Sequence, residues 1–131
     1  MYNNSHPGIE YGDGVLKGPG TPGVVVKSVE SNVFSLPTAT GDKIVGVLKR
    51  TDKNCAAQAA GDTTPCVVDT GAFVFQTDQF TGSPAYGNNL TFDATTGKLK
   101  VATTGLQIVG RVLSVDGTEI TVLWTNHGLV V

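Results

Sequence analysis

Two cysteines and two histidines are the residues whose chemistry is most readily judged from the sequence. Cys55 and Cys66 flank the stretch AAQAAGDTTP, where a disulfide would close a short loop and stabilise the fold by about 2–3 kcal/mol. The alternative is a pair of small buried thiols, which we favour because nothing else marks a disulfide scaffold. His6 and His127 stand near opposite ends of the chain, so they predict neither a zinc site nor a catalytic pair.

Three glycine-containing triplets resemble parts of phosphate-binding loops. Gly12-Asp13-Gly14 and Gly18-Pro19-Gly20 have no predicted strand before them and no helix after them, so we interpret both as loose turns. Thr96-Gly97-Lys98 lacks the residues that a P-loop needs on either side of it. Many of the 11 acidic residues sit beside Gly or Thr, where Asp favours turns. The sequence therefore predicts no catalytic residue, no metal ligand and no cofactor.

The composition excludes several classes of partner. The 131 residues include 17 glycines, 15% of them are charged, and the formal net charge is −2. A low charged fraction with much glycine is typical of a chain with many turns and few long helices. Nucleic-acid binding needs clustered Lys and Arg, which are missing, and no apolar run approaches the ~20 residues of a membrane span. The N-terminus does not resemble a secretory signal, so we expect a protein used without secretion, nucleic acid or membrane.

Short strand-like segments recur about every 8–12 residues, and none keeps a helical period over three turns. The expected strands are GVVVKSV at 23–29, KIVGVLKR at 43–50, two around Asp69-Thr70-Gly71, LTFD at 90–93, KLKV at 98–101, and the hairpin at 107–124 that turns at Asp116-Gly117. An Asp-Gly turn between apolar alternations is a strong hairpin signal. The pattern predicts an all-β, single-domain barrel or sandwich.

The segments KIVGVLK at 43–49 and QIVGRVL at 107–113 resemble each other. Each places a Gly after Ile-Val, and a Gly inside a strand often marks a bulge or the close approach of another backbone. We expect the two strands to occupy equivalent positions of the barrel and to bend at Gly46 and Gly110.

Residues 1–22 differ from the rest of the chain, because Gly, Pro and Asn interrupt every strand or helix period. They fit a disordered terminus, or an arm that becomes ordered against a partner through its spaced apolar residues. The predicted division is an extended N-terminal arm at 1–22 and a β-barrel domain at 23–131. The candidate anchors of the arm are Tyr2, Ile9, Tyr11, Val15 and Leu16. Trp124, at the end of the last strand, fits a core cap, an oligomer interface or a sugar-stacking platform.

The order of small motifs over residues 36–124 resembles that of small capsid decoration, or cement, proteins of tailed bacteriophages. The motifs are Ile44-Val45-Gly46-Val47, Gly71-Ala72-Phe73-Val74, the stretch from Gly87 to Leu99, residues 108–113 and residues 120–123. Asn88-Asn89 departs from the Gly-Asp of that pattern, and the Cys-flanked loop is longer. The resemblance implies a β-barrel or β-tulip-like domain, commonly a homotrimer, on the outer surface of a phage head assembled in the host cytoplasm.

The resemblance also implies a function. A cement protein binds the major capsid protein, bridges neighbouring capsomers and adds buried surface between them, which requires an inert domain rather than an enzyme. Trp124 and the anchors of the arm are then the candidate contacts with the capsid or a neighbouring subunit. One alternative is a carbohydrate- or receptor-binding module of a phage fibre or spike, with Trp124, Tyr86 and Tyr11 as its aromatic platform. A second alternative, an OB-like nucleic-acid binder, is disfavoured by the negative net charge.

Overall fold

The computed structural model describes residues 3–6 and 9–126, which form β-strands and no helix. The strands are β1 (Asn3–His6), β2 (Ile9–Lys17), β3 (Val25–Glu30), β4 (Val33–Ser35), β5 (Ile44–Thr51), β6 (Thr63–Thr70), β7 (Phe73–Thr77), β8 (Asn89–Phe92), β9 (Leu99–Val101), β10 (Gly110–Asp116) and β11 (Glu119–Trp124). The prediction of a small all-β domain that contains a barrel is confirmed.

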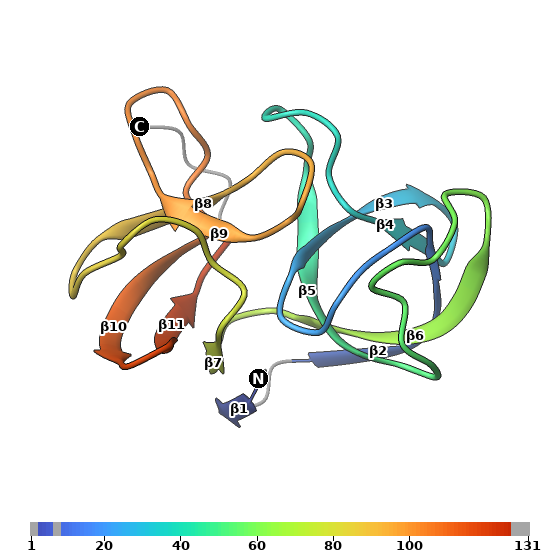
Figure 1. Ribbon diagram of the computed structural model, residues 1–131, viewed down its shortest axis with the longest axis horizontal. Helices are drawn as coiled ribbons and strands as arrows, with labels where there is room; N and C mark the ends of the chain where they lie inside the picture. The colour runs from blue at the N-terminus through green and yellow to red at the C-terminus, as the bar shows by residue number, and fades with distance from the viewer. Residues whose placement is uncertain (1–2, 7–8, 127–131) are drawn as a thin grey trace.

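Five strands close into a barrel in the order β2-β4-β3-β5-β6, with β6 antiparallel to β2 at the point of closure. Neighbouring strands are antiparallel except β2 and β4, which run parallel through the pairs Val15–Val33 and Leu16–Phe34. The barrel fills the right half of Figure 1. Each of its strands has two hydrogen-bonded neighbours, so closure leaves no free edge in this half of the fold.

The remaining strands form an open antiparallel sheet in the order β1-β7-β11-β10-β8-β9, on the left of Figure 1. The predicted β10–β11 hairpin is present, but its two-residue turn is Gly117-Thr118 and not Asp116-Gly117, because Asp116 still pairs with Glu119. Gly117 takes the positive φ of 62° that a turn with Gly at its first position needs. The outer edge of β9 is covered by the segment around Phe80: Leu99 N donates to Gln79 O at 3.0 Å, and Thr81 N donates to Leu99 O at 2.9 Å. β1 forms the other edge of the sheet.

Two hydrophobic cores result, and β3 and β5 contribute to both. The barrel core contains Leu16, Val24, Val26, Phe34, Leu48, Cys55, Cys66 and Val68. The interlayer core lies between the barrel and the sheet and contains Val25, Ile44, Val47, Phe73, Phe75, Leu90, Phe92, Leu99, Val109, Val112, Ile120, Val122 and Trp124. Val25 and Val26 thus face opposite cores, since successive side chains of a strand alternate. Continuous apolar runs such as Val24-Val25-Val26 suit a strand that is covered on both faces.

The two Ile-Val-Gly strands use glycine in the same way but lie in different sheets. A Cβ at Gly46 would lie 2.3 Å from the carbonyl oxygen of Asp69, and a Cβ at Gly110 would lie 2.8 Å from that of Leu123. The β3–β5 register shifts beside Gly46, which leaves Val45 as a bulge. The predicted close approach is confirmed. The predicted equivalent barrel positions are wrong, because β10 belongs to the open sheet.

The boundary predicted at residue 23 does not coincide with a boundary of the barrel. Ile9–Lys17 is the barrel strand β2, paired with β6 from Ile9–Thr70 to Lys17–Thr63, so the prediction that this segment forms part of an arm is wrong. The residues Gly12-Asp13-Gly14 are a bulged part of this strand instead of a loose turn. Glycine is required at 14, where a Cβ would lie 2.3 Å from the ring of Phe34. The low strand propensity of these three residues is overridden because β2 pairs with two neighbouring strands.

Candidate partner-binding surfaces

The described residues provide no cluster of side chains that could hold a metal ion. Within residues 3–6 and 9–126, no three His, Cys, Asp or Glu side chains come together so that they could hold a metal ion. The same residues contain no helix that is long and apolar enough to cross a membrane. His127 lies outside the described residues.

Cys55 and Cys66 are free thiols buried in the barrel core, in line with the interpretation preferred over a disulfide. Burial raises the pKa of the Cys66 thiol to about 11, and the nearby Cys55 acts in the same direction. The Cys55 thiol lies 3.4 Å from the carbonyl oxygen of Lys53 and 3.5 Å from Oε1 of Gln58. A buried thiol with a raised pKa is a poor nucleophile, so Cys66 is suited to packing in the barrel core.

Two of the six predicted contact residues are core residues. Leu16 is 0% exposed in the barrel core, and Trp124 is 0% exposed in the interlayer core. The Trp124 ring packs against Phe73 and Phe75, with ring centroids 6.1 and 6.3 Å apart. The prediction that Leu16 and Trp124 contact a partner is therefore wrong. Both side chains point to the covered face of their strands, and burial of a large apolar side chain there is strongly favourable.

The other predicted contacts lie at the start of the chain, and three of them are accessible on β2. Tyr2 is outside the described residues. Ile9 is 71% exposed, and Val15 is half-buried. Tyr11 is 37% exposed, but its ring packs edge-on against Phe34 at a centroid distance of 5.6 Å and its hydroxyl donates to Asn32 Oδ1. Ile9 is therefore the predicted contact residue that the fold leaves most available.

A small charged cluster stands beside Ile9. Oε2 of Glu10 accepts a hydrogen bond from Nζ of Lys49 at 2.6 Å and lies 3.9 Å from Nη1 of Arg50. The hydrogen bond from Lys49, together with its charge, lowers the pKa of Glu10. Exposed ion pairs of this kind add little to stability. They place charged side chains of both signs next to the accessible side chain of Ile9.

A second accessible apolar region lies on and beside β10, and we did not predict it from the sequence. Leu113 is 38% exposed and Val115 47% exposed on β10, and Tyr86 is 78% exposed. Tyr86 belongs to the segment before β8, which lies beside β10 because Gly87 N donates to Val112 O at 2.9 Å. Alternation of apolar and polar residues along the hairpin indicates which side chains face the core. The exposed apolar side chains of Leu113 and Val115 break that alternation beyond the β10–β11 bulge, so the sequence pattern did not reveal them.

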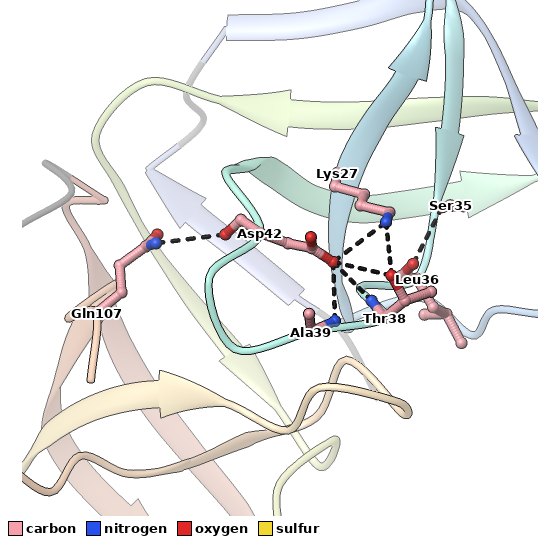
Figure 2. A network of polar contacts seen from close by, with 7 residues as sticks. All are labelled: Lys27, Ser35, Leu36, Thr38, Ala39, Asp42 and Gln107. Atoms are coloured by element: carbon pink, nitrogen blue, oxygen red, sulfur yellow. Dashed lines mark hydrogen bonds and ion pairs between the residues drawn. The ribbon is translucent and has the colours of Figure 1, made fainter. Parts of the chain in front are cut away.

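The loop at 36–43 is held in one conformation by Asp42. Figure 2 shows Oδ2 of Asp42 accepting from the backbone N–H groups of Thr38 at 2.7 Å and Ala39 at 3.0 Å, with Nζ of Lys27 at 3.1 Å. The backbone hydrogen bond from Thr38 contributes most to lowering the pKa of Asp42 to about 2. Gln107 Nε2 donates to Asp42 O at 3.3 Å, which connects this barrel loop to the sheet. Asp42 thus braces this loop through its own backbone and through the neighbouring strand β3.

The geometry describes a two-core scaffold with accessible apolar side chains on β2 and β10 and with braced loops. No protein-family model matches the chain, and no curated protein or solved structure matches it. The function is therefore inferred from the residues and their arrangement.

Proposed function

We propose that this chain is a decoration, or cement, protein of a tailed-bacteriophage head. It binds the major capsid protein on the outer surface of the head, bridges neighbouring capsomers and stabilises the particle. The proposal is carried by the position of the residues that resemble this family. The stretch 36–124 supplies every member of the interlayer core except Val25. The residues that carry the resemblance are thus mainly residues that pack the core. This is expected for proteins that hold other proteins together and transform no substrate.

The architecture supports a load-bearing role. The barrel is closed, the β9 edge is covered by a neighbouring segment, and both cores are clusters of buried apolar side chains, so the body can resist deformation. The exposed side chains of Ile9, Tyr86, Leu113 and Val115 offer apolar area that contact with a capsomer would remove from water. A persistent protein–protein contact buries roughly 1,000 Å² or more.

We propose further that three copies act together, as the family resemblance implies. A homotrimer on a threefold site of the head engages several capsomers at once, so that weak contacts multiply through avidity. The described residues of the predicted arm are part of the folded body, because β1 pairs with β7 at the edge of the sheet and β2 belongs to the barrel. Deleting residues 1–22 would remove β2 and open the barrel, so that truncation is unsuitable as a test.

The test is co-sedimentation of the full chain with empty, expanded heads of the phage that encodes it. We expect saturable binding at a fixed ratio to the capsid protein. An Ile9→Asp variant run in parallel is expected to bind about tenfold more weakly if β2 contributes to the contact. Absence of binding by the folded wild-type chain at any concentration would overturn the proposed function.

The carbohydrate- or receptor-binding alternative finds less support. Its three expected aromatic residues are not available together, because Trp124 is buried and the Tyr11 ring packs on Phe34. Tyr86 alone is fully accessible, whereas sugar recognition needs an accessible ring at a shaped site. If the co-sedimentation fails, a glycan array is the next measurement.

A further inference from the structure

A groove opens where three loops meet between the barrel and the β8–β9 turn. It consists of two adjoining hollows of about 280 and 220 Å³, which share Pro19, Leu36 and Thr95 in their walls. Pro19, Leu36 and Pro37 give it an apolar surface, and Leu36 also packs against the barrel core. We call this feature the loop groove. Its three main walls come from segments far apart in the sequence, residues 17–21, 35–38 and 95–98. Val24, Ala56, Ala60 and Gln79 complete the lining.

The first wall of the loop groove is fixed before any partner binds. Gly18 N donates to Asp62 O at 2.9 Å, and Gly20 N donates to Cys55 O at 3.0 Å. Gln58 Nε2 donates to Gly18 O at 2.9 Å, while Oε1 of Gln58 accepts from Thr64 Oγ1 at 2.5 Å. These bonds tie the segment 17–21 to the loop between β5 and β6.

The other two walls are braced by aspartates. Asp42 holds the segment 35–38 through the backbone N–H of Thr38, as Figure 2 shows. Asp93 Oδ1 accepts from Thr95 N at 3.0 Å, and Gly97 O accepts from Val25 N at 2.9 Å, which docks the turn on β3. A site whose walls are already ordered loses little conformational entropy on binding, so affinity per contact is higher.

The charges of the loop groove are of one sign. Lys17 and Lys98 line its two hollows, and no Asp or Glu does so among the described residues. The ion pairs found among those residues involve Lys27, Lys49 and Arg50, so neither groove lysine has a carboxylate partner there. The chain as a whole carries a net charge of −2. The groove is therefore a local positive site that fits a negatively charged partner.

The geometry points to the loop groove as the docking site for an extended segment of the capsid protein that carries a carboxylate beside an apolar residue. This inference rests on the proposed function. The apolar residue would lie on Pro19 and Leu36, and the carboxylate would pair with Lys17 or Lys98 at the rim. A sugar fits less well, because no aromatic ring lines either hollow among the described residues.

The test compares two double variants in the co-sedimentation assay. Lys17→Glu/Lys98→Glu reverses the charge of the groove, and Lys43→Glu/Lys53→Glu is the matched control at exposed lysines outside it. Each Lys→Glu change alters the charge by −2, so both variants move the net charge from −2 to −6. Thermal unfolding of both verifies that they fold. We expect the groove variant to bind heads at least tenfold more weakly than the wild type, with a smaller salt dependence, and the control to bind within about twofold of it.

The outcomes separate the two proposals. Wild-type binding that is lost in the groove variant and kept in the control supports both. Wild-type binding that is equal in all three proteins, or equally weakened in both variants, overturns the loop groove as the docking site and leaves the proposed function standing. No binding by the wild type overturns the proposed function, and the groove inference falls with it.

Discussion

The barrel and the six-stranded sheet bury their apolar side chains in different ways. The barrel closes on itself and encloses a core made mostly of aliphatic side chains. The sheet is open, and its inner face is covered by three barrel residues that point outward, namely Val25, Ile44 and Val47. The sheet supplies the large aromatic side chains of the shared core, which bury the most area per residue. The barrel is therefore self-contained, whereas the sheet depends on the barrel to cover its inner face.

The largest effect is expected from emptying the interlayer core at Trp124. A Trp124→Ala variant leaves a large cavity and should lower the free energy of unfolding by about 3–5 kcal/mol, as measured by urea denaturation. The rate of amide hydrogen exchange should increase much more in β10 and β11 than in β2 to β6, because the sheet loses the contact that covers it.

The matched control is Leu48→Ala in the barrel core, where Leu48 is 0% exposed. It should cost about 2–5 kcal/mol and accelerate exchange in both halves, since loosening the barrel also uncovers the sheet. Faster exchange in the barrel than in the sheet of the Trp124→Ala variant would contradict the dependence of the sheet on the barrel.

A smaller effect is expected from the two glycines that lie in corresponding strands of the two halves. Gly46→Ala places a Cβ 2.3 Å from the backbone oxygen of Asp69 inside a closed barrel, where no strand can move away freely. It should cost about 3 kcal/mol, at the upper end for overpacking. Gly110→Ala meets Leu123 O at 2.8 Å in an open sheet and should cost about 1 kcal/mol. The midpoints of urea unfolding measure both, and equal costs would mean that closure does not stiffen β5.

Gln58 braces the barrel end and offers the next test. Gln58→Ala leaves Gly18 O and Thr64 Oγ1 without this partner and should cost about 1–3 kcal/mol, because buried polar groups lose their hydrogen bonds. Gln79→Ala is the control on the sheet side, since its amide bonds the exposed Asp78 carboxylate, and it should change stability by less than about 0.5 kcal/mol. A thermal unfolding series compares them, and an equal loss in both would show that the 17–21 wall is not held by Gln58.

The smallest effect is expected in the pH dependence of the free energy of unfolding. It compares Asp42 in a barrel loop with Asp93 in a turn of the sheet. The folded pKa of Asp42 is about 2, below its ordinary value of 3.8, so the unfolded chain takes up the proton first as the pH falls. The stability that Asp42 contributes is therefore complete above about pH 4 and is lost as the pH falls toward 2. Asp42→Asn should cost roughly 1 kcal/mol at neutral pH and flatten the curve of stability against pH in that window.

Asp93 is the counterpart in the sheet, where the backbone N–H of Thr95 lowers its pKa in the same direction. Asp93→Asn should flatten the acid limb of the curve less than Asp42→Asn, because Lys27 adds its charge to the hydrogen bonds of Asp42 and no lysine among the described residues does so for Asp93. Unfolding midpoints between pH 2 and 6 for the wild type and both variants make the comparison. A larger change in Asp93→Asn would contradict this ranking of the two loops.

The sequence predicted most strands because their signals are local. The Asp116-Gly117 pair indicated the last hairpin, whose turn lies one residue later at Gly117-Thr118, and alternation around Phe73 and Leu99 marked the strands before it. β2 was missed because Gly12 and Asp13 lower strand propensity, and its place depends on pairing with β6, some 50 residues later. The two cores were not separated, since a run such as Val24-Val25-Val26 does not reveal what covers each face. The loop groove was not predictable, because its walls come from three segments that only the tertiary fold brings together.

The most direct test of the proposed function is a cryo-electron microscopy reconstruction of expanded heads saturated with this chain, beside one of the same heads without it. We predict additional density on the outer surface that fits the barrel and the sheet, with the loop groove facing the shell and an extended capsid segment between Lys17 and Lys98. Identical reconstructions, at protein concentrations that saturate any specific site, would contradict the proposal that this chain is a capsid decoration protein.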